Sequence, residues 1–174
     1  MEMAVLGLGV SIQTFRGQED FSIGVNDIYK YHPADYVLCL DGKEQFTPER
    51  LKVIEQCTPK IFYSQQEDWA THPQFQRITL ARPRGGLGEL DTERICYYIE
   101  TPLSATILAY KLGASSIVLY GADYKDHPKI KGDRTLQALK KIYFDLYNLL
   151  KQRGVSLKVS SKHSILSDVI PLNY

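Results

Sequence analysis

Short apolar runs alternate along this chain with segments whose apolar residues recur every three or four positions. Short runs rich in apolar residues, typical of strands, occur at residues 3–8, 21–25, 60–63, 117–120 and 155–159. The run at 36–40 is apolar without interruption, as expected of a strand buried on both faces. Helical spacing is clearest between Leu136 and Leu150, where leucines and a tyrosine fall on one face. Strands that alternate with helices predict an α/β fold with a single Rossmann-like, mostly parallel sheet and helices on both faces.

Capping and terminating residues mark the ends of the predicted helices. Thr47-Pro48 and Thr101-Pro102 each combine an N-cap hydroxyl with a proline in the first turn. The helix that begins at Thr101 is expected to stop at Gly113, and the last long helix at Gly154, because glycine is favoured just beyond a helix. Residues 64–95 show no clear periodicity and predict irregular structure.

Length and composition indicate an ordinary globular protein. The 174 residues predict one domain over residues 1–174, which is long enough to bury a core. The net charge of +1 argues against a protein that coats nucleic acid. No apolar stretch approaches the ~20 residues of a membrane span. The three cysteines, Cys39, Cys57 and Cys96, are too far apart for a zinc motif, so we expect reduced thiols in a cytoplasmic protein.

Polar residues follow several of the predicted strands. Gly121 and Asp123 come directly after the run at 116–120, and Asn26 and Asp41 follow two earlier strands. Because the carboxyl ends of parallel strands share one edge of a sheet, we expect these side chains to line a common crevice. Asn26 can then bond a base or ribose, and Asp41 and Asp123 can hold a hydrated Mg²⁺ against a polyphosphate. The alternative is that each is a turn residue, since asparagine and aspartate favour turns.

The turn after the first strand and one helix start are further candidates for nucleotide binding. Gly7 and Gly9 allow the backbone to approach a phosphate or base, and Ser11 can cap the next helix. Thr101 and Ser104 lie where free N–H groups favour an anion. A plain turn explains the glycines equally well, and capping alone explains Thr101.

A histidine and two arginines are the remaining candidates for chemistry. His127 lies shortly after Asp123, and its ordinary pKa near neutrality suits a general base. Arg82 and Arg84 lie on a glycine-rich loop and have the forked donors that bind phosphate. The alternative for all three is a solvated position on a surface loop.

Four stretches at the two ends of the chain form a recognisable set. They are Gly7-x-Gly9-x-Ser11, Ser22 to Asp27, Leu108 to Gly113 with Ile117 to Tyr124, and Ser164-Ile165-Leu166 through Ile170-Pro171-Leu172. This set resembles the bacterial sialyltransferases of glycosyltransferase family 42. It is also similar to the related archaeal-type hydroxymethylpterin diphosphokinases.

The sialyltransferase resemblance implies a Rossmann-like sheet that binds a CMP-sugar donor and transfers its sugar to a glycan or small-molecule acceptor. It implies that Tyr124 binds the donor phosphate and that His127 is the base that deprotonates the acceptor hydroxyl. Together with the strand-end residues, the expected nucleotide-binding set is Gly7, Gly9, Ser11, Asn26, Asp41, Thr101, Ser104, Gly121, Asp123 and Tyr124.

The chain departs from the sialyltransferase pattern at three places. Leu8 and Val10 replace an asparagine and a proline, Asp41 replaces a second nucleotide-binding asparagine, and no lid separates Tyr124 from His127. A transferase is expected, and two alternatives stay open: a Mg²⁺-dependent diphosphokinase that uses Asp41 and Asp123, and a non-catalytic nucleotide-binding or assembly protein. A short domain without a lid also suits a homo-oligomer in which a partner subunit covers the site.

Overall fold

The computed structural model describes residues 1–125, 130 and 132–173. Its centre is a seven-stranded sheet in the order β5-β4-β3-β2-β1-β6-β7, and every strand pairing is parallel. This confirms the predicted α/β class with its Rossmann-like sheet. The strands are β1 (Glu2–Leu6), β2 (Phe21–Val25), β3 (Tyr36–Leu38), β4 (Ile61–Ser64), β5 (Phe75–Arg77), β6 (Ser116–Tyr120) and β7 (Ser156–Val159).

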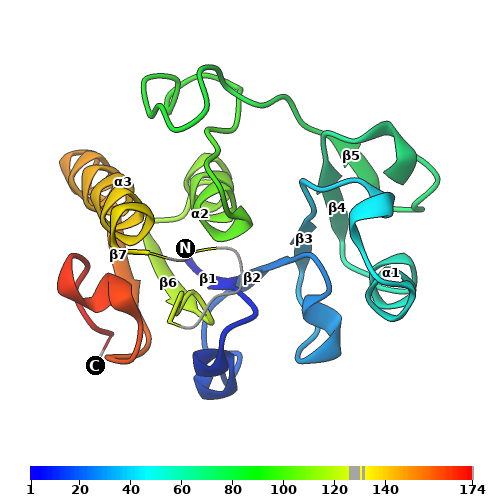
Figure 1. Cartoon of the computed structure of the whole chain (residues 1–174), viewed down its shortest axis with the longest axis horizontal. Helices are drawn as coiled ribbons and strands as arrows, with labels where there is room; N and C mark the ends of the chain where they lie inside the picture. Colours follow the sequence, from blue (N-terminus) through cyan, green and yellow to red (C-terminus); the bar gives the residue numbers. More distant parts are fainter. Residues whose placement is uncertain (126–129, 131, 174) are drawn as a thin grey trace.

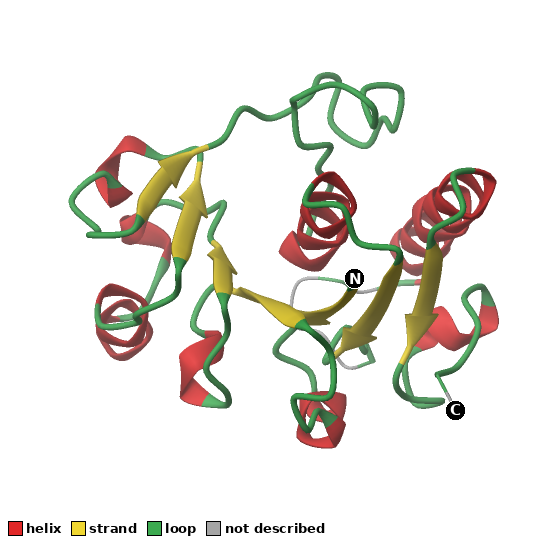
Figure 2. Cartoon of the chain, turned by 180° about the vertical axis from the view of Figure 1, so that it is seen from behind, coloured by secondary structure: helices red, strands yellow, loops and turns green. Residues whose placement is uncertain are grey.

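Helices cover both faces of the sheet, as Figures 1 and 2 show from opposite sides. The α-helices are α1 (Pro48–Glu55), α2 (Thr101–Lys111) and α3 (Asp133–Gln152). Short 3-10 helices fill several connections: η1 (Val10–Thr14), η2 (Ile28–Lys30), η3 (Lys43–Gln45), η4 (Glu67–Trp69) and η5 (Ile165–Asp168). In Figure 1, α2 and α3 lie on one face, whereas α1 and the first turns of the chain lie on the other. None of the helices in the described part of the chain has the length and apolar character that a membrane span requires.

The central strand β1 is apolar and buried at four of its five positions because each face of the sheet belongs to a different core. In β1, Met3 and Val5 belong to the core beneath α2 and α3, whereas Ala4 and Leu6 belong to the core on the opposite face. All four side chains are at most 1% exposed. Because successive side chains point to opposite faces, these four residues supply apolar side chains to both cores.

The segment before α2 contains structure that the sequence did not predict. Residues 64–95 include the edge strand β5 and the short helix η4, each only three residues long. Farther along, Leu90, Ile95 and Cys96 are buried against α2. The helix α2 is therefore enclosed between the sheet and this segment, and residues 101–109 are all buried.

The cap of α2 differs from the expectation. Thr101 is the first helical residue rather than the cap, and Glu100 is the N-cap. The Glu100 carboxylate accepts a hydrogen bond from the backbone N–H of Leu103 at 3.1 Å. Glutamate is outside the usual set of capping residues, which is why the Thr-Pro pair misplaced the helix start by one residue.

All three cysteines lie in the interior and none forms a disulfide. Burial is the largest cause that raises the pKa of the Cys39 thiol well above its ordinary value, and burial also raises the pKa of Cys57 to about 12. Both thiols are therefore kept in their unreactive protonated form near neutral pH.

Candidate functional site

The strand order reverses direction between β1 and β6. From β1 the chain continues to β2 on one side, and β6 later pairs with β1 on the other side. In open parallel sheets, ligands bind outside the carboxyl ends of the strands at such a reversal. The carboxyl edge formed by β1, β6 and the adjacent β2 is therefore the candidate site.

Backbone hydrogen bonds join the turns that follow β1 and β6. The N–H of Gly7 donates to Tyr120 O at 2.7 Å, and the N–H of Gly9 donates to Gly121 O at 2.8 Å. A Cβ atom on Gly7 would collide with the Gly121 carbonyl, and one on Gly9 would lie 2.8 Å from the same oxygen. The predicted glycines Gly7, Gly9 and Gly121 are thus brought together, and the first two are needed for this close approach of two main chains.

Ser11 and Asp123 meet directly across this junction. The Ser11 N–H donates to Asp123 Oδ2 at 2.8 Å, the Ser11 hydroxyl donates to Oδ1 of the same carboxylate, and the Gly121 N–H donates to Ser11 Oγ at 2.8 Å. Both side chains are buried. An acid at the start of η1 compensates its free N–H groups. The predicted convergence of the two residues is present, and each oxygen of the carboxylate already accepts a bond from Ser11.

Asn26 occupies the end of β2, next to β1 in the sheet. Its backbone has φ of 50°, and its N–H donates to Leu38 O at 3.1 Å. The side-chain oxygen Oδ1 is buried and has no hydrogen-bond partner within the described part of the chain. A buried amide oxygen without a partner is costly. Asn26 is therefore suited to accept a hydrogen bond from an amino or hydroxyl group of a ligand.

The structure does not bring Asp41 and Asp123 together. Asp41 follows β3, which is separated from β6 by β2 and β1. Three strand spacings of about 4.8 Å place the two backbones roughly 14 Å apart, too far for both carboxylates to ligate one Mg²⁺ directly. The backbone oxygen of Asp41 accepts the Trp69 indole N–H at 2.9 Å, which fixes this loop to η4.

Thr101 and Ser104 lie inside the molecule at the start of α2. They are 8% and 0% exposed, and the Ser104 hydroxyl donates to Cys96 O at 3.1 Å. The carboxylate of Glu100 already occupies the N-terminal end of this helix. The helix start is therefore compensated by the chain's own acid rather than open to an anion.

Tyr124 turns its phenol inward from the same edge. Its backbone has φ of 56°, its side chain is 6% exposed, and its hydroxyl donates to Glu100 Oε2 at 2.5 Å. The hydroxyl also lies 2.9 Å from Tyr143 Oη. Burial raises the pKa of Glu100 to about 7, although these hydrogen bonds lower it.

His127 lies outside the described residues, so its position relative to the edge is left open. A second histidine that sequence reasoning assigned no role, His163, follows β7 at the same edge. Its segment is held there because Ser164 Oγ donates to Ala122 O at 2.7 Å and the Ile165 N–H donates to Asp123 O at 3.1 Å. The signal that could have found it is the one used for the other strands, a polar segment directly after a buried strand.

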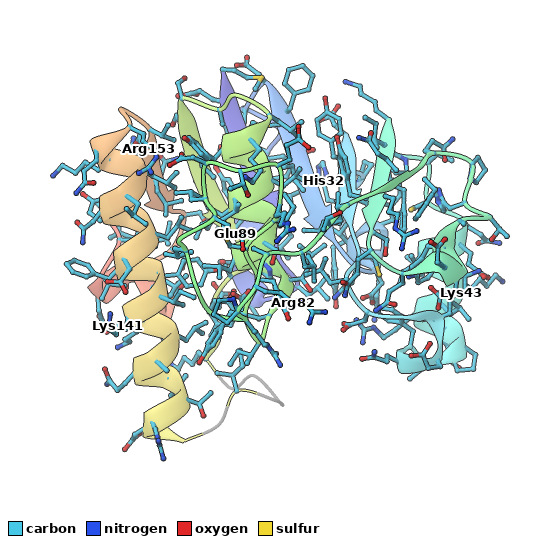
Figure 3. The ribbon with its side chains drawn as sticks, turned by 90° about the horizontal axis from the view of Figure 1, so that it is seen from above. His32, Lys43, Arg82, Glu89, Lys141 and Arg153 are labelled. Carbon is cyan, nitrogen blue, oxygen red and sulfur yellow. The ribbon has the colours of Figure 1, made fainter. Side chains whose placement is uncertain are left out.

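Arg82 and Arg84 lie on the segment that crosses over α2, where Figure 3 labels Arg82. Arg84 Nε donates to Tyr98 O at 3.2 Å, so this guanidinium is bonded within its own segment. A groove of about 590 Å³ lies between this segment and α3. It is separate from the strand ends and is lined by Gly85, Leu87, Gly88, Asp91, Tyr98, Ala138, Lys141, Ile142, Asp145, Leu149 and Arg153.

Comparisons with known proteins place the chain among sialyltransferase folds. No family model and no curated protein matches the sequence. The sialyltransferase CstII in complex with a trisaccharide acceptor and CMP matches with a TM-score of 0.59 and 14% identity, over 99% of this chain and 86% of that chain. CstII from Campylobacter jejuni with cytidine-5'-monophosphate matches with a TM-score of 0.61 and 13% identity, over 98% and 84%.

A third structure, CstII from Campylobacter jejuni with the substrate analogue CMP-3FNeuAc, matches with a TM-score of 0.58 and 14% identity, over 98% of this chain and 84% of that chain. These matches agree with the sialyltransferase resemblance, and they give no support to the diphosphokinase resemblance. At this level of identity the likeness extends to the fold alone. The chain thus has the fold seen in the CstII sialyltransferase structures.

Proposed function

We propose that this protein is a glycosyltransferase of the sialyltransferase type, which uses a CMP-sugar as its donor. The proposal is carried by one combination of observations. The fold is that of structures solved with CMP and with CMP-3FNeuAc, and Asn26 presents a buried, unpartnered oxygen at the carboxyl edge where such a fold binds ligands. A cytosine amino group or a ribose hydroxyl would satisfy that oxygen.

In this proposal the glycine junction and Asn26 form the nucleotide site. The glycines let the turns after β1 and β6 pack closely beside the site, and Asn26 supplies the acceptor. Ser11, Gly121 and Asp123 hold the junction in place by their mutual hydrogen bonds. Tyr124, Thr101 and Ser104 are buried, and the hydroxyls of Tyr124 and Ser104 already bond to protein groups. We therefore propose that these three residues support the site from beneath rather than contact the nucleotide.

The proposed reaction is a displacement at the anomeric carbon of the donor sugar. The acceptor hydroxyl oxygen forms the new bond to that carbon, while the bond from the carbon to the CMP phosphate oxygen breaks and CMP leaves with its electron pair. His127 is proposed to take the proton of the acceptor hydroxyl. This assignment rests on the sequence resemblance.

Nucleotide titration separates this function from its alternatives. Isothermal calorimetry with CMP, CTP and ATP, each with and without Mg²⁺, should detect CMP binding that does not require metal. Mg²⁺-dependent binding of ATP would instead favour the diphosphokinase. If none of the three nucleotides binds, the remaining alternative is the non-catalytic assembly protein.

Turnover tests the base. His127→Ala should reduce sugar transfer by roughly 10²- to 10⁴-fold, the usual contribution of a general base, with CMP affinity unchanged. His163→Ala is the informative companion, because His163 is an exposed histidine of the described edge. If His163→Ala abolishes transfer and His127→Ala does not, the base has been assigned to the wrong histidine.

A further inference from the structure

A buried cluster of one carboxyl and two phenols lies beneath the candidate site. Glu100 caps α2, Tyr124 ends the turn after β6, and Tyr143 belongs to α3. The cluster therefore joins a helix start, the carboxyl edge of the sheet and a second helix. None of the three side chains is exposed by more than 9%.

The Tyr124 hydroxyl is at the centre of this cluster. It donates to Glu100 Oε2 at 2.5 Å and lies 2.9 Å from the Tyr143 hydroxyl. The same carboxylate accepts the Leu103 N–H. A carboxyl group in the interior is costly unless its oxygens are bonded, so Glu100 and Tyr124 each fix the position of the other.

This arrangement extends to the edge through the backbone of Tyr124. A tyrosine at a φ of 56° is in the left-handed region, which costs about 1 kcal/mol for a residue other than glycine and persists only when its surroundings enforce it. The anchored phenol provides that enforcement. The residue immediately before it, Asp123, holds both the N–H and the hydroxyl of Ser11.

We propose that Glu100 is a positioning residue, whose carboxylate holds Tyr124 and thereby fixes the Asp123–Ser11 junction at the nucleotide-binding edge. Tyr143 supports it by bonding the same phenol. The part of this inference that concerns nucleotide affinity rests on the proposed function, whereas the part that concerns the order of the junction does not.

Glu100→Leu is the variant that tests this inference. Leucine fills a similar volume and removes the buried carboxyl. It also removes the N-cap bond to the Leu103 N–H, so global stability is measured beside the local effect, and Tyr124 loses its bond to Glu100. Thr106→Val is the matched control, because the Thr106 hydroxyl is also buried in α2 and donates to Pro102 O at 2.8 Å without reaching the edge. Glu100→Gln is the conservative variant, since its amide oxygen can still accept from Tyr124.

Hydrogen exchange measures the junction without any ligand. The amides of Ser11 and Gly121 donate to Asp123 and Ser11, so they report directly on its order. Glu100→Leu should reduce the protection of both amides by about tenfold. Thr106→Val should leave this protection unchanged, and Glu100→Gln should retain most of it. CMP affinity measured by calorimetry should fall in the same order of variants.

The outcomes separate the two proposals. If Glu100→Leu keeps wild-type protection at Ser11 and Gly121, or loses protection evenly over the whole chain, Glu100 is not a positioning residue and the proposed function is unaffected. If the wild-type protein does not bind CMP, the proposed function fails, and exchange at the two amides still decides whether Glu100 positions the junction.

Discussion

The carboxyl edge of the sheet has two halves that use similar residues differently. Between β1 and β6, two main-chain hydrogen bonds join the turns, and Ser11 and Asp123 satisfy each other. The second half lies at the ends of β2 and β3. There the Asn26 side-chain oxygen has no partner among the described residues, and Asp41 is only half-buried. One half is closed by the protein's own bonds, and the other is the half to which the proposed function assigns the ligand.

The difference separates residues that shape a site from residues that contact its ligand. Serine, asparagine and aspartate after a strand all indicate a ligand edge, yet at the strand-order reversal Ser11 and Asp123 hold two backbones together. Buried acids occupy both helix starts there, Asp123 at η1 and Glu100 at α2. A nucleotide phosphate therefore gains little from those helix ends. In the proposed function, recognition of the base or ribose is expected to depend on the side chain of Asn26.

Gly7→Ala should have the largest effect on the closed half. The added Cβ would collide with the Gly121 carbonyl, and neither main chain can move without breaking its hydrogen bonds. We expect the free energy of unfolding to fall by roughly 4 kcal/mol, measured by urea denaturation. Gly88→Ala is the control, since open space surrounds that glycine. Equal stability of the two variants would show that the turns are not in close contact.

The pH dependence of stability tests the cluster beneath the closed half. Burial raises the pKa of Glu100 from 4.5 to about 7, so the folded protein binds a proton more tightly than the unfolded chain. The stabilisation from this group is complete below the unfolded pKa and is lost as pH rises through the folded value. It amounts to about 3 kcal/mol between roughly pH 4.5 and 7.

The measurement is the urea denaturation midpoint over that pH range. In the described part of the chain, the titratable groups bonded to Glu100 are Tyr124 and Tyr143, which stay protonated because burial raises the pKa of both well above 10.0. Glu100→Gln should flatten this part of the stability profile. A wild-type profile that matches that of the variant would place the titration of Glu100 near its ordinary pKa.

Asp123→Asn should cost about 2 kcal/mol of unfolding free energy, because an amide can accept only one of the two bonds that the carboxylate accepts from Ser11. Asp41→Asn provides the comparison from the open half and should change stability by no more than about 0.5 kcal/mol. Thermal denaturation of both variants checks the contrast. A loss of equal size at Asp41 would remove the distinction between the two halves.

Sequence patterns predicted most of the sheet because all of its strands except β5 are short and rich in buried apolar residues. The run at 21–25 coincides with β2, and the cap and proline at Thr47-Pro48 correctly begin α1. β5 was missed because two of its three residues are exposed, so hydrophobic periodicity gives no signal there. The start of α2 was misplaced because its cap, Glu100, gains its role from burial beside Tyr124, a contact between residues distant in sequence.

Sequence patterns located residues of the candidate edge but not the partners of their side chains. Strand-end patterns located Ser11, Asn26 and Asp123, whereas the strand order that separates Asp41 from Asp123 is a long-range property of the fold. The inward direction of the Tyr124 phenol depends on a positive φ and on a carboxyl group 24 positions earlier. Neither can be deduced from local sequence.

Asn26→Gly should have the smallest effect, and it isolates the open half. Glycine accepts the positive φ of this position, so stability should change little while the unpartnered amide oxygen is removed. If that oxygen accepts a hydrogen bond from the nucleotide, CMP affinity should fall about tenfold, or roughly 1.4 kcal/mol. Calorimetry should show this loss for CMP while the urea denaturation midpoint stays near that of the wild type. Unchanged affinity would mean that the nucleotide does not bond to this oxygen. The open half would then lose the buried, unpartnered group of the described structure that assigns it to the nucleotide.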